Sequence, residues 1–150
     1  MAPAMIDFVE KKSVKEVLEV LDDYGKDQWS GGSFNLLFAD SEGNIAYQMS
    51  GALPIRKKEL PYLGCRILDG RTTDYDWEWG KVAPISDLPR SVNPEKGYIV
   101  TANNRQTSDS VTVDHGAQTL SPGRAERITE IIQSKIDAGE KITHEDANQM

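Results

Sequence analysis

The sequence has 150 residues, of which 38% are hydrophobic and 27% are charged, a composition typical of a globular chain with a core of its own. This length predicts one domain spanning residues 1–150. The 24 acidic residues outnumber the 17 basic ones and give a net charge of −7, which argues against nucleic acid or an anionic membrane surface as a partner.

The scarcity of cysteine and histidine excludes several kinds of site. Cys65 is the single cysteine, so no internal disulfide can form, and with His115 and His144 it makes no zinc-binding pattern. No apolar run approaches 18 residues, so no segment is expected to cross a bilayer. Residues 1–8 lack the basic and apolar regions of a signal peptide, so the chain as it stands would stay in the cytoplasm.

The first element predicted is a helix over residues 14–24. Ser13 and Glu16 have the spacing of a capping box, in which each side chain binds the backbone N–H of the other residue. Apolar residues at helical spacing follow, namely Val14, Val17, Leu18 and Leu21. Gly25 is the expected end of the helix.

A β-hairpin is predicted next. Residues 34–39 are apolar, residues 40–43 have the composition of a turn, and residues 44–49 alternate, with Ile45, Tyr47 and Met49 on one face. Gly43 is free to take the positive φ that such a turn needs. Because Pro54 and Pro61 interrupt regular structure, we expect residues 52–64 to be irregular. We also expect residues 65–94 to form a mostly irregular excursion that packs its aromatic side chains inward.

The last third of the chain is predicted to contain a strand followed by helices. Residues 97–102 have the β-branched and aromatic content of a strand. A helix is expected from about Gly123 to Ala138, with Gly139 as its end and a stripe formed by Ala125, Ile128, Ile132 and Ile136. Residues 143–146 resemble a further helix start. The fold class is therefore α+β, with an antiparallel hairpin and strands packed against helices.

Most of the polar residues have no pattern that predicts catalysis. The sequence has no Gly-x-Ser-x-Gly elbow and no phosphate-binding glycine loop, and its carboxylate pairs are typical of a solvated acidic surface. Asn103 and Asn104 differ because they follow an apolar run. An asparagine amide held there can donate to a developing oxyanion, although an asparagine-rich turn explains the same spacing.

Several segments, in order, resemble the penicillin acylase family of N-terminal-nucleophile hydrolases. Residues 38–47 (FADSEGNIAY) are similar to its ADxxGNIGY hairpin, and residues 51–56 (GALPIR) to its GRIPIR segment. Residues 60–64 (LPYLG) and 76–80 (DWEWG) resemble its LPVPG and EWxG segments. Residues 93–105, which end in TANNR, and residues 124–128 (RAERI) resemble its NPxxGxIVTANNR and RAxRI segments. The likeness covers roughly residues 34–150.

The resemblance implies a partial αββα sandwich and an amide hydrolase whose nucleophile is an N-terminal serine. Asn103 matches the family's oxyanion-hole asparagine, and Arg127 matches an arginine that helps to position substrate. Asp114 corresponds to a calcium-binding aspartate, although residues 106–122 depart from the family pattern. No cofactor is implied for the reaction, and a structural calcium ion is the one metal that the resemblance suggests. Family members are commonly periplasmic or secreted.

The N-terminal serine of the family has no counterpart in this chain. Position 1 is Met, and Ser33 directly precedes the hairpin, whereas the family's nucleophile lies far upstream of it. The chain therefore resembles an internal segment of the β-chain, whose partners would be the rest of the acylase. On its own we expect it to be inactive and to self-associate through an open sheet edge and an apolar face. The alternative is a truncated, non-catalytic relative that serves as an interaction or structural module.

Overall fold

A computed structural model describes residues 7–26, 32–57, 67–106 and 121–148. The chain divides into two compact units, each with its own internal structure. The first comprises residues 1–99 and 109–117, and the second comprises residues 100–108 and 118–150. Described helices and antiparallel strands confirm the α+β class.

The first unit is built on helix α2 (Val14–Lys26). The predicted capping box forms, since the Ser13 N–H donates to Glu16 Oε2 at 3.1 Å and the Glu16 N–H donates to Ser13 Oγ at 3.2 Å. All four residues of the predicted apolar face are buried, and Leu21 is completely so. Gly25 was expected to end the helix, which instead includes Gly25 and ends at Lys26. A glycine inside a helix costs only about 1 kcal/mol relative to alanine, less than packing can supply.

Three strands form an antiparallel sheet in the order β1-β2-β5. The hairpin is confirmed: β1 (Asn35–Ala39) pairs with β2 (Ile45–Met49), and Gly43 in the turn has φ +89°. Strand β5 (Arg90–Val92) pairs with the other side of β2. Strand β2 is therefore central, and it is buried on both faces.

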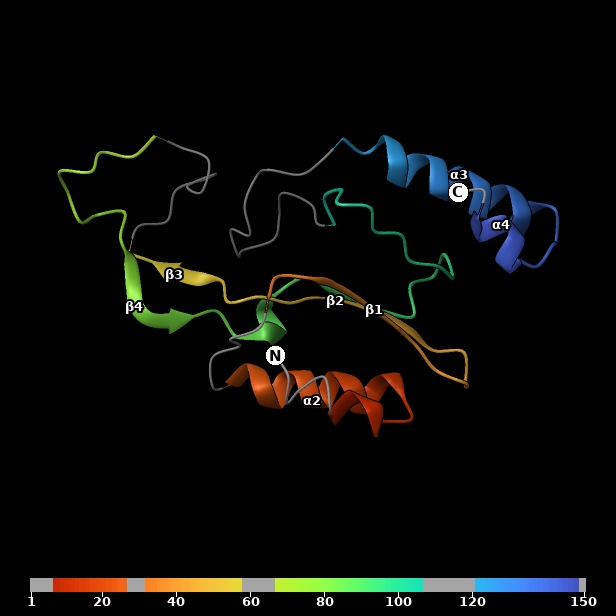
Figure 1. The fold of residues 1–150 in the computed structure, drawn as a ribbon, viewed down its shortest axis with the longest axis horizontal. Coiled ribbons are helices and arrows are strands. Elements are labelled where there is room, and N and C mark those ends of the chain that lie inside the picture. Colours follow the sequence, from red (N-terminus) through yellow and green to blue (C-terminus); the bar gives the residue numbers. More distant parts are fainter. Residues whose placement is uncertain (1–6, 27–31, 58–66, 107–120, 149–150) are drawn as a thin grey trace. The chain divides into compact units, whose positions relative to one another are not determined.

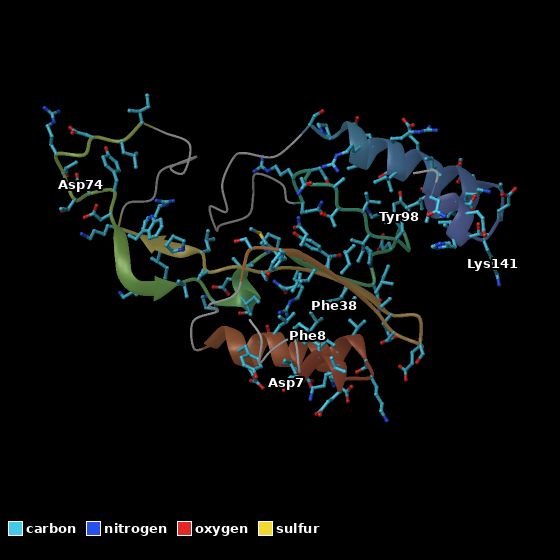
Figure 2. The ribbon with its side chains drawn as sticks, viewed as in Figure 1. Asp7, Phe8, Phe38, Asp74, Tyr98 and Lys141 are labelled. Carbon is cyan, nitrogen blue, oxygen red and sulfur yellow. The ribbon has the colours of Figure 1, made fainter. Side chains whose placement is uncertain are left out.

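Helix α2 lies along one face of this sheet (Figure 1). Leu18 and Leu21 from the helix pack with Ala46 from β2 and with Ile85 from the 3-10 helix η2 (Ile85–Asp87). Phe38 borders this core and meets Phe8 edge to face, with ring centroids 5.9 Å apart (Figure 2). The core of the first unit therefore lies between α2 and the sheet.

The expectation that residues 52–64 are irregular is wrong in part, whereas the described part of residues 65–94 is mostly irregular as expected but includes short elements. Within residues 52–64, Pro54–Arg56 forms strand β3, and within residues 65–94 the structure has β4 (Trp77–Val82), η2 and β5. Strands β3 and β4 pair with each other in a two-stranded sheet. Proline is tolerated at the first position of an edge strand, because its missing N–H is not needed there. Trp77 is not packed inward: it is 59% exposed, with the Arg56 guanidinium over its ring.

The second unit contains helices α3 (Gly123–Asp137) and α4 (His144–Asn148). Both expected helices are confirmed, and Gly139 follows α3 with φ +68°. Only part of the expected apolar stripe on α3 is buried: Ala125 is buried, whereas Ile136 is 45% exposed. Thr143 and Asp146 cap the start of α4 reciprocally.

The strand expected over residues 97–102 does not form. Neither sheet of the described residues includes this segment. The N–H of Gly97 closes a turn on Pro94 O, and the N–H of Ala102 donates to the Asn104 side chain instead of to a neighbouring strand. A β-branched composition favours a strand only where another strand is available for pairing.

Candidate functional site

Asn103 and Asn104, the asparagine pair considered as an oxyanion donor, lie at a sharp backbone turn in the second unit, which we call the corner (residues 102–104). Asn103 has φ +62°, in the left-handed region that asparagine tolerates better than most residues. The turn follows Ala102, which is 8% exposed, and the side chain of Asn103 is itself exposed. The corner therefore presents Asn103 outward from a backbone that is fixed on its N-terminal side.

The Asn103 amide is oriented by an arginine from α3. Nη2 of Arg124 donates both to the backbone oxygen of Ala102 and to Oδ1 of Asn103, each at 2.8 Å. A guanidinium only donates, so the atom that faces Arg124 must be the amide oxygen. Among the described residues, Nδ2 of Asn103 has no acceptor. As far as the described ranges go, its N–H groups are therefore available to a ligand.

Asn104 has a different role from its neighbour. Its Oδ1 accepts hydrogen bonds from the Ala102 N–H and from Gln106 Nε2, both at 3.0 Å, and its Nδ2 donates to the Arg105 oxygen at 3.2 Å. Both ends of this amide are used within the turn. The sequence allowed two interpretations of the asparagine pair, an asparagine-rich turn and an oxyanion donor. Asn104 fits the first because its side chain stabilises the turn, and Asn103 fits the second because its Nδ2 is left to donate.

Arg127 lies on α3 three residues after Arg124, so the two side chains leave neighbouring positions of the helix surface. The Arg127 side chain is 67% exposed, and its Nη1 is 3.3 Å from Oε2 of Glu130, which is equally exposed. Within the described ranges, no hydrogen bond or ion pair joins Arg127 to Asn103. An ion pair this exposed is weak and easily displaced by a ligand.

Thr101 adds a second unusual feature to the corner. Its Oγ1 is buried and has no hydrogen-bond partner among the described residues. Leaving a buried hydroxyl unpaired costs roughly 1–3 kcal/mol, so such groups are uncommon in folded proteins. The segment before Asn103 therefore contains a polar atom for which the described part of the chain supplies no partner.

The remaining sequence candidates add no further site within the described residues. Asp114, the candidate calcium ligand, lies outside the described residues, as do Cys65 and His115. In the described ranges, no group of three or more His, Cys, Asp or Glu residues could hold a metal ion. The carboxylate of Asp76 is more than half exposed and lies 3.8 Å from Lys57 Nζ, as expected of a solvated acidic surface.

Arg124 is the residue that reasoning from the sequence missed. One signal was present: a cation in the first turn of a helix is opposed by the positive end of the helix dipole. Arg124 is the second residue of α3, where an acidic residue such as the nearby Glu126 is favoured. Its partner, 21 residues away, could not be identified from spacing.

Comparison with known proteins places the chain in a family. The family model described as penicillin amidase matches residues 2–150. Penicillin G acylase of Escherichia coli is 34% identical over 103 residues, and the acyl-homoserine lactone acylase QuiP of Pseudomonas aeruginosa is 38% identical over 101. These alignments cover 66% and 65% of this chain but only 11% of either relative. The chain thus spans about a ninth of the length of these relatives.

A solved structure agrees with this assignment. The thermostable penicillin G acylase from Alcaligenes faecalis superimposes with a TM-score of 0.57 at 22% sequence identity, covering 85% of this chain and 22% of that one. This likeness shows a shared fold. No helix in the described ranges is long and apolar enough to cross a membrane. The family match over nearly the whole chain and the shared fold together show that this chain belongs to the penicillin amidase family.

Proposed function

We propose that residues 1–150 are a segment of the β-chain of an N-terminal-nucleophile amide hydrolase and supply its oxyanion donor, Asn103. The observation that carries the proposal is the Asn103 amide, whose oxygen is held by Arg124 while its Nδ2 is left to donate. Membership of the penicillin amidase family supports the class of reaction. The short span of the chain along its relatives supports its being one part of a larger enzyme.

In the proposed reaction, the nucleophile is a serine supplied by polypeptide outside residues 1–150. Its Oγ attacks the acyl carbon, its proton passes through the serine's own α-amine to the leaving amine, and the C–N bond breaks. Water then cleaves the acyl ester and releases the carboxylic acid. Nδ2 of Asn103 donates to the negatively charged oxygen of each tetrahedral intermediate, a contact worth about 2.7–4 kcal/mol in such sites.

The proposed substrates are compounds in which an acyl group is joined to an amine by an amide bond. The relatives named above are a penicillin acylase and an acyl-homoserine lactone acylase. The proposed substrates all contain an acyl group joined to an amine, and they differ in the groups on either side of the amide bond. We further propose that Arg127 positions the substrate, because its exposed guanidinium exchanges Glu130 for a ligand at little cost.

The direct test compares variants of the full-length gene product that contains this segment. Asn103→Ala is expected to lower kcat about 10²–10³-fold on phenylacetyl amides or long-chain acyl amides. Asn148→Ala removes an exposed asparagine from α4 and is the matched control, with unchanged kcat. Full activity in Asn103→Ala would refute the assignment of the oxyanion donor.

A second test uses the 150-residue chain alone. We expect no turnover, because an oxyanion donor accelerates little without a nucleophile. Ser33 is the serine to exclude, since it follows Gly32 as in a processing site. Turnover by the isolated chain that disappears in Ser33→Ala would show that the nucleophile lies within this segment, contrary to the proposal.

We propose that the rest of the acylase covers Leu37, on the face of the sheet that points away from α2. Leu36 and Phe38 pack toward the core, so the alternating Leu37, which is 50% exposed, points to the opposite face. In the part of the chain that the structure describes, strands β1 and β5 are also the edge strands of their sheet. Sedimentation of the isolated chain should therefore show concentration-dependent association that Leu37→Glu weakens. A monomer that binds no hydrophobic dye would contradict this proposal.

A further inference from the structure

We propose that Arg124 is a positioning residue for the oxyanion donor: it sets the orientation of the Asn103 amide. This inference rests on the proposed function of Asn103. The contact joins the first turn of α3 to the corner at residues 102–104, and both of its hydrogen bonds come from one nitrogen of the guanidinium.

The need for such a residue follows from the shape of an asparagine amide. Its oxygen and nitrogen are nearly the same size, so an exposed side chain can rotate and exchange their positions. When the amide nitrogen faces the substrate, Asn103 donates a hydrogen bond to the oxyanion. When the amide oxygen faces the substrate, its partial negative charge repels the oxyanion. Because Arg124 can only donate, it selects the first orientation and disfavours the second.

The same arginine also fixes the backbone on which Asn103 stands. Nη2 binds the Ala102 oxygen at 2.8 Å, one residue before the left-handed turn at Asn103. On the other side of the turn, the Asn104 side chain binds the Ala102 N–H. Both polar groups of the Ala102 backbone are therefore bound, which limits the movement of the turn. A donor that is already oriented needs no reorganisation when the oxyanion forms.

The charge of Arg124 acts in the same direction. A cation bound to the amide oxygen withdraws electron density from the nitrogen and makes its N–H groups stronger donors. The position is unfavourable for the helix itself, because Arg124 adds positive charge near the N-terminus of α3. An arginine at this position destabilises α3 slightly, which is consistent with a role in holding Asn103 instead of a role in stabilising the helix.

The kinetic test uses the full-length enzyme with Arg124→Met, Arg124→Lys and the double variant Asn103→Ala/Arg124→Met. Arg124→Met should lower kcat about 10–100-fold, as expected for a misplaced catalytic group, and should change KM little. Arg124→Lys keeps a charged donor without the planar fork and should lie between Met and wild type. Arg71→Met, at an exposed pair in the first unit, is the matched control and should leave kcat unchanged.

The double variant separates positioning from a general loss of structure. If Arg124 acts through Asn103, adding Arg124→Met to Asn103→Ala should lower kcat no further. Independent, multiplying effects of the two substitutions would overturn the inference. If Asn103→Ala is impaired and Arg124→Met is not, the inference fails while the proposed function stands. If Asn103→Ala is fully active, the proposed function itself fails.

A measurement independent of activity tests the orientation directly. The 150-residue chain is labelled with ¹⁵N-asparagine, and the side-chain NH₂ resonances of Asn103 are compared in wild type, Arg124→Lys and Arg124→Met. We expect both variants to shift these resonances and to speed their exchange with water, while those of Asn148 stay in place. Unchanged Asn103 resonances in folded Arg124→Lys would refute the contact, whether or not the full enzyme is active.

Discussion

A buried polar contact between helix α2 and the sheet provides the most discriminating test of the fold. Gln48, in the central strand β2, is fully buried. Its Oε1 accepts a hydrogen bond from Arg90 Nε, and its Nε2 donates to the oxygens of Met49 and Ile85. The far end of Arg90 binds both carboxylate oxygens of Asp22 in α2.

Arg90→Met is expected to destabilise the chain mainly through Gln48. Methionine keeps an apolar stem of similar length but leaves the buried Gln48 oxygen without a donor, which costs roughly 1–3 kcal/mol. The loss at Asp22 adds about 0–1 kcal/mol, because its side chain is 37% exposed and can hydrate. We therefore expect a total of about 1–4 kcal/mol, which at a urea m-value of about 1–3 kcal/mol per M corresponds to a fall on the order of 1 M in the urea midpoint.

Urea unfolding of the 150-residue chain, followed by tryptophan fluorescence, measures this effect. Asp22→Asn removes the charge at the exposed end only and should cost less than Arg90→Met. Arg71→Met removes a similar bidentate contact, the one between Arg71 and Asp69. Because the Arg71 side chain is 90% exposed, the urea midpoint of this variant should equal that of the wild type. The reasoning is refuted if Arg90→Met behaves like Arg71→Met, or if Asp22→Asn costs as much as Arg90→Met.

Three further predictions concern the same unit. Leu21→Ala should lower the free energy of unfolding by about 2–5 kcal/mol in urea titrations, because Leu21 is completely buried; a cost below that of Arg71→Met would contradict the assigned core. Gly51→Ala should destabilise more than Gly43→Ala in thermal unfolding. Both glycines have positive φ, but only a Cβ at Gly51 would meet another atom, Ser33 Oγ at 2.5 Å; equal Tm values would count against this close approach. Hydrogen bonds from the Asn44 side chain and from the Val14 N–H lower the pKa of the Asp40 carboxyl from its ordinary value. The stability from this shift is present above the unfolded-state pKa and is lost as the pH falls through the lower folded-state pKa. Asp40→Asn should therefore flatten the acid limb of a stability–pH profile, and an unchanged limb would show that other carboxylates cause it.

The elements that the sequence predicted depend on signals only a few residues apart. Ser13 and Glu16 predicted the start of α2, and the spacing of its apolar residues predicted the buried face. Gly43 predicted the hairpin turn, and Gly139 the end of α3. These predictions hold because capping, helical periodicity and turn geometry are set within one or two turns of chain.

The elements that it missed depend on distant partners. Residues 97–102 have the composition of a strand but pair with no described strand, whereas the proline-containing Pro54–Arg56 pairs with β4. The order of the sheet likewise required Arg90–Val92 to join β2 from more than 40 positions away. Composition describes what a segment can do, and the choice among partners is made only when the chain folds.

For the candidate site too, one part could be predicted from the sequence and another part depended on the folded structure. The sequence by itself identified Asn103, and its resemblance to a family gave the amide an expected role. Only the tertiary structure showed that Arg124, 21 residues later, holds the oxygen of that amide, and that Asn104 serves the turn instead. The physical reason is that a residue's type determines which hydrogen bonds it can make, whereas the folded backbone determines which donor and acceptor come within reach.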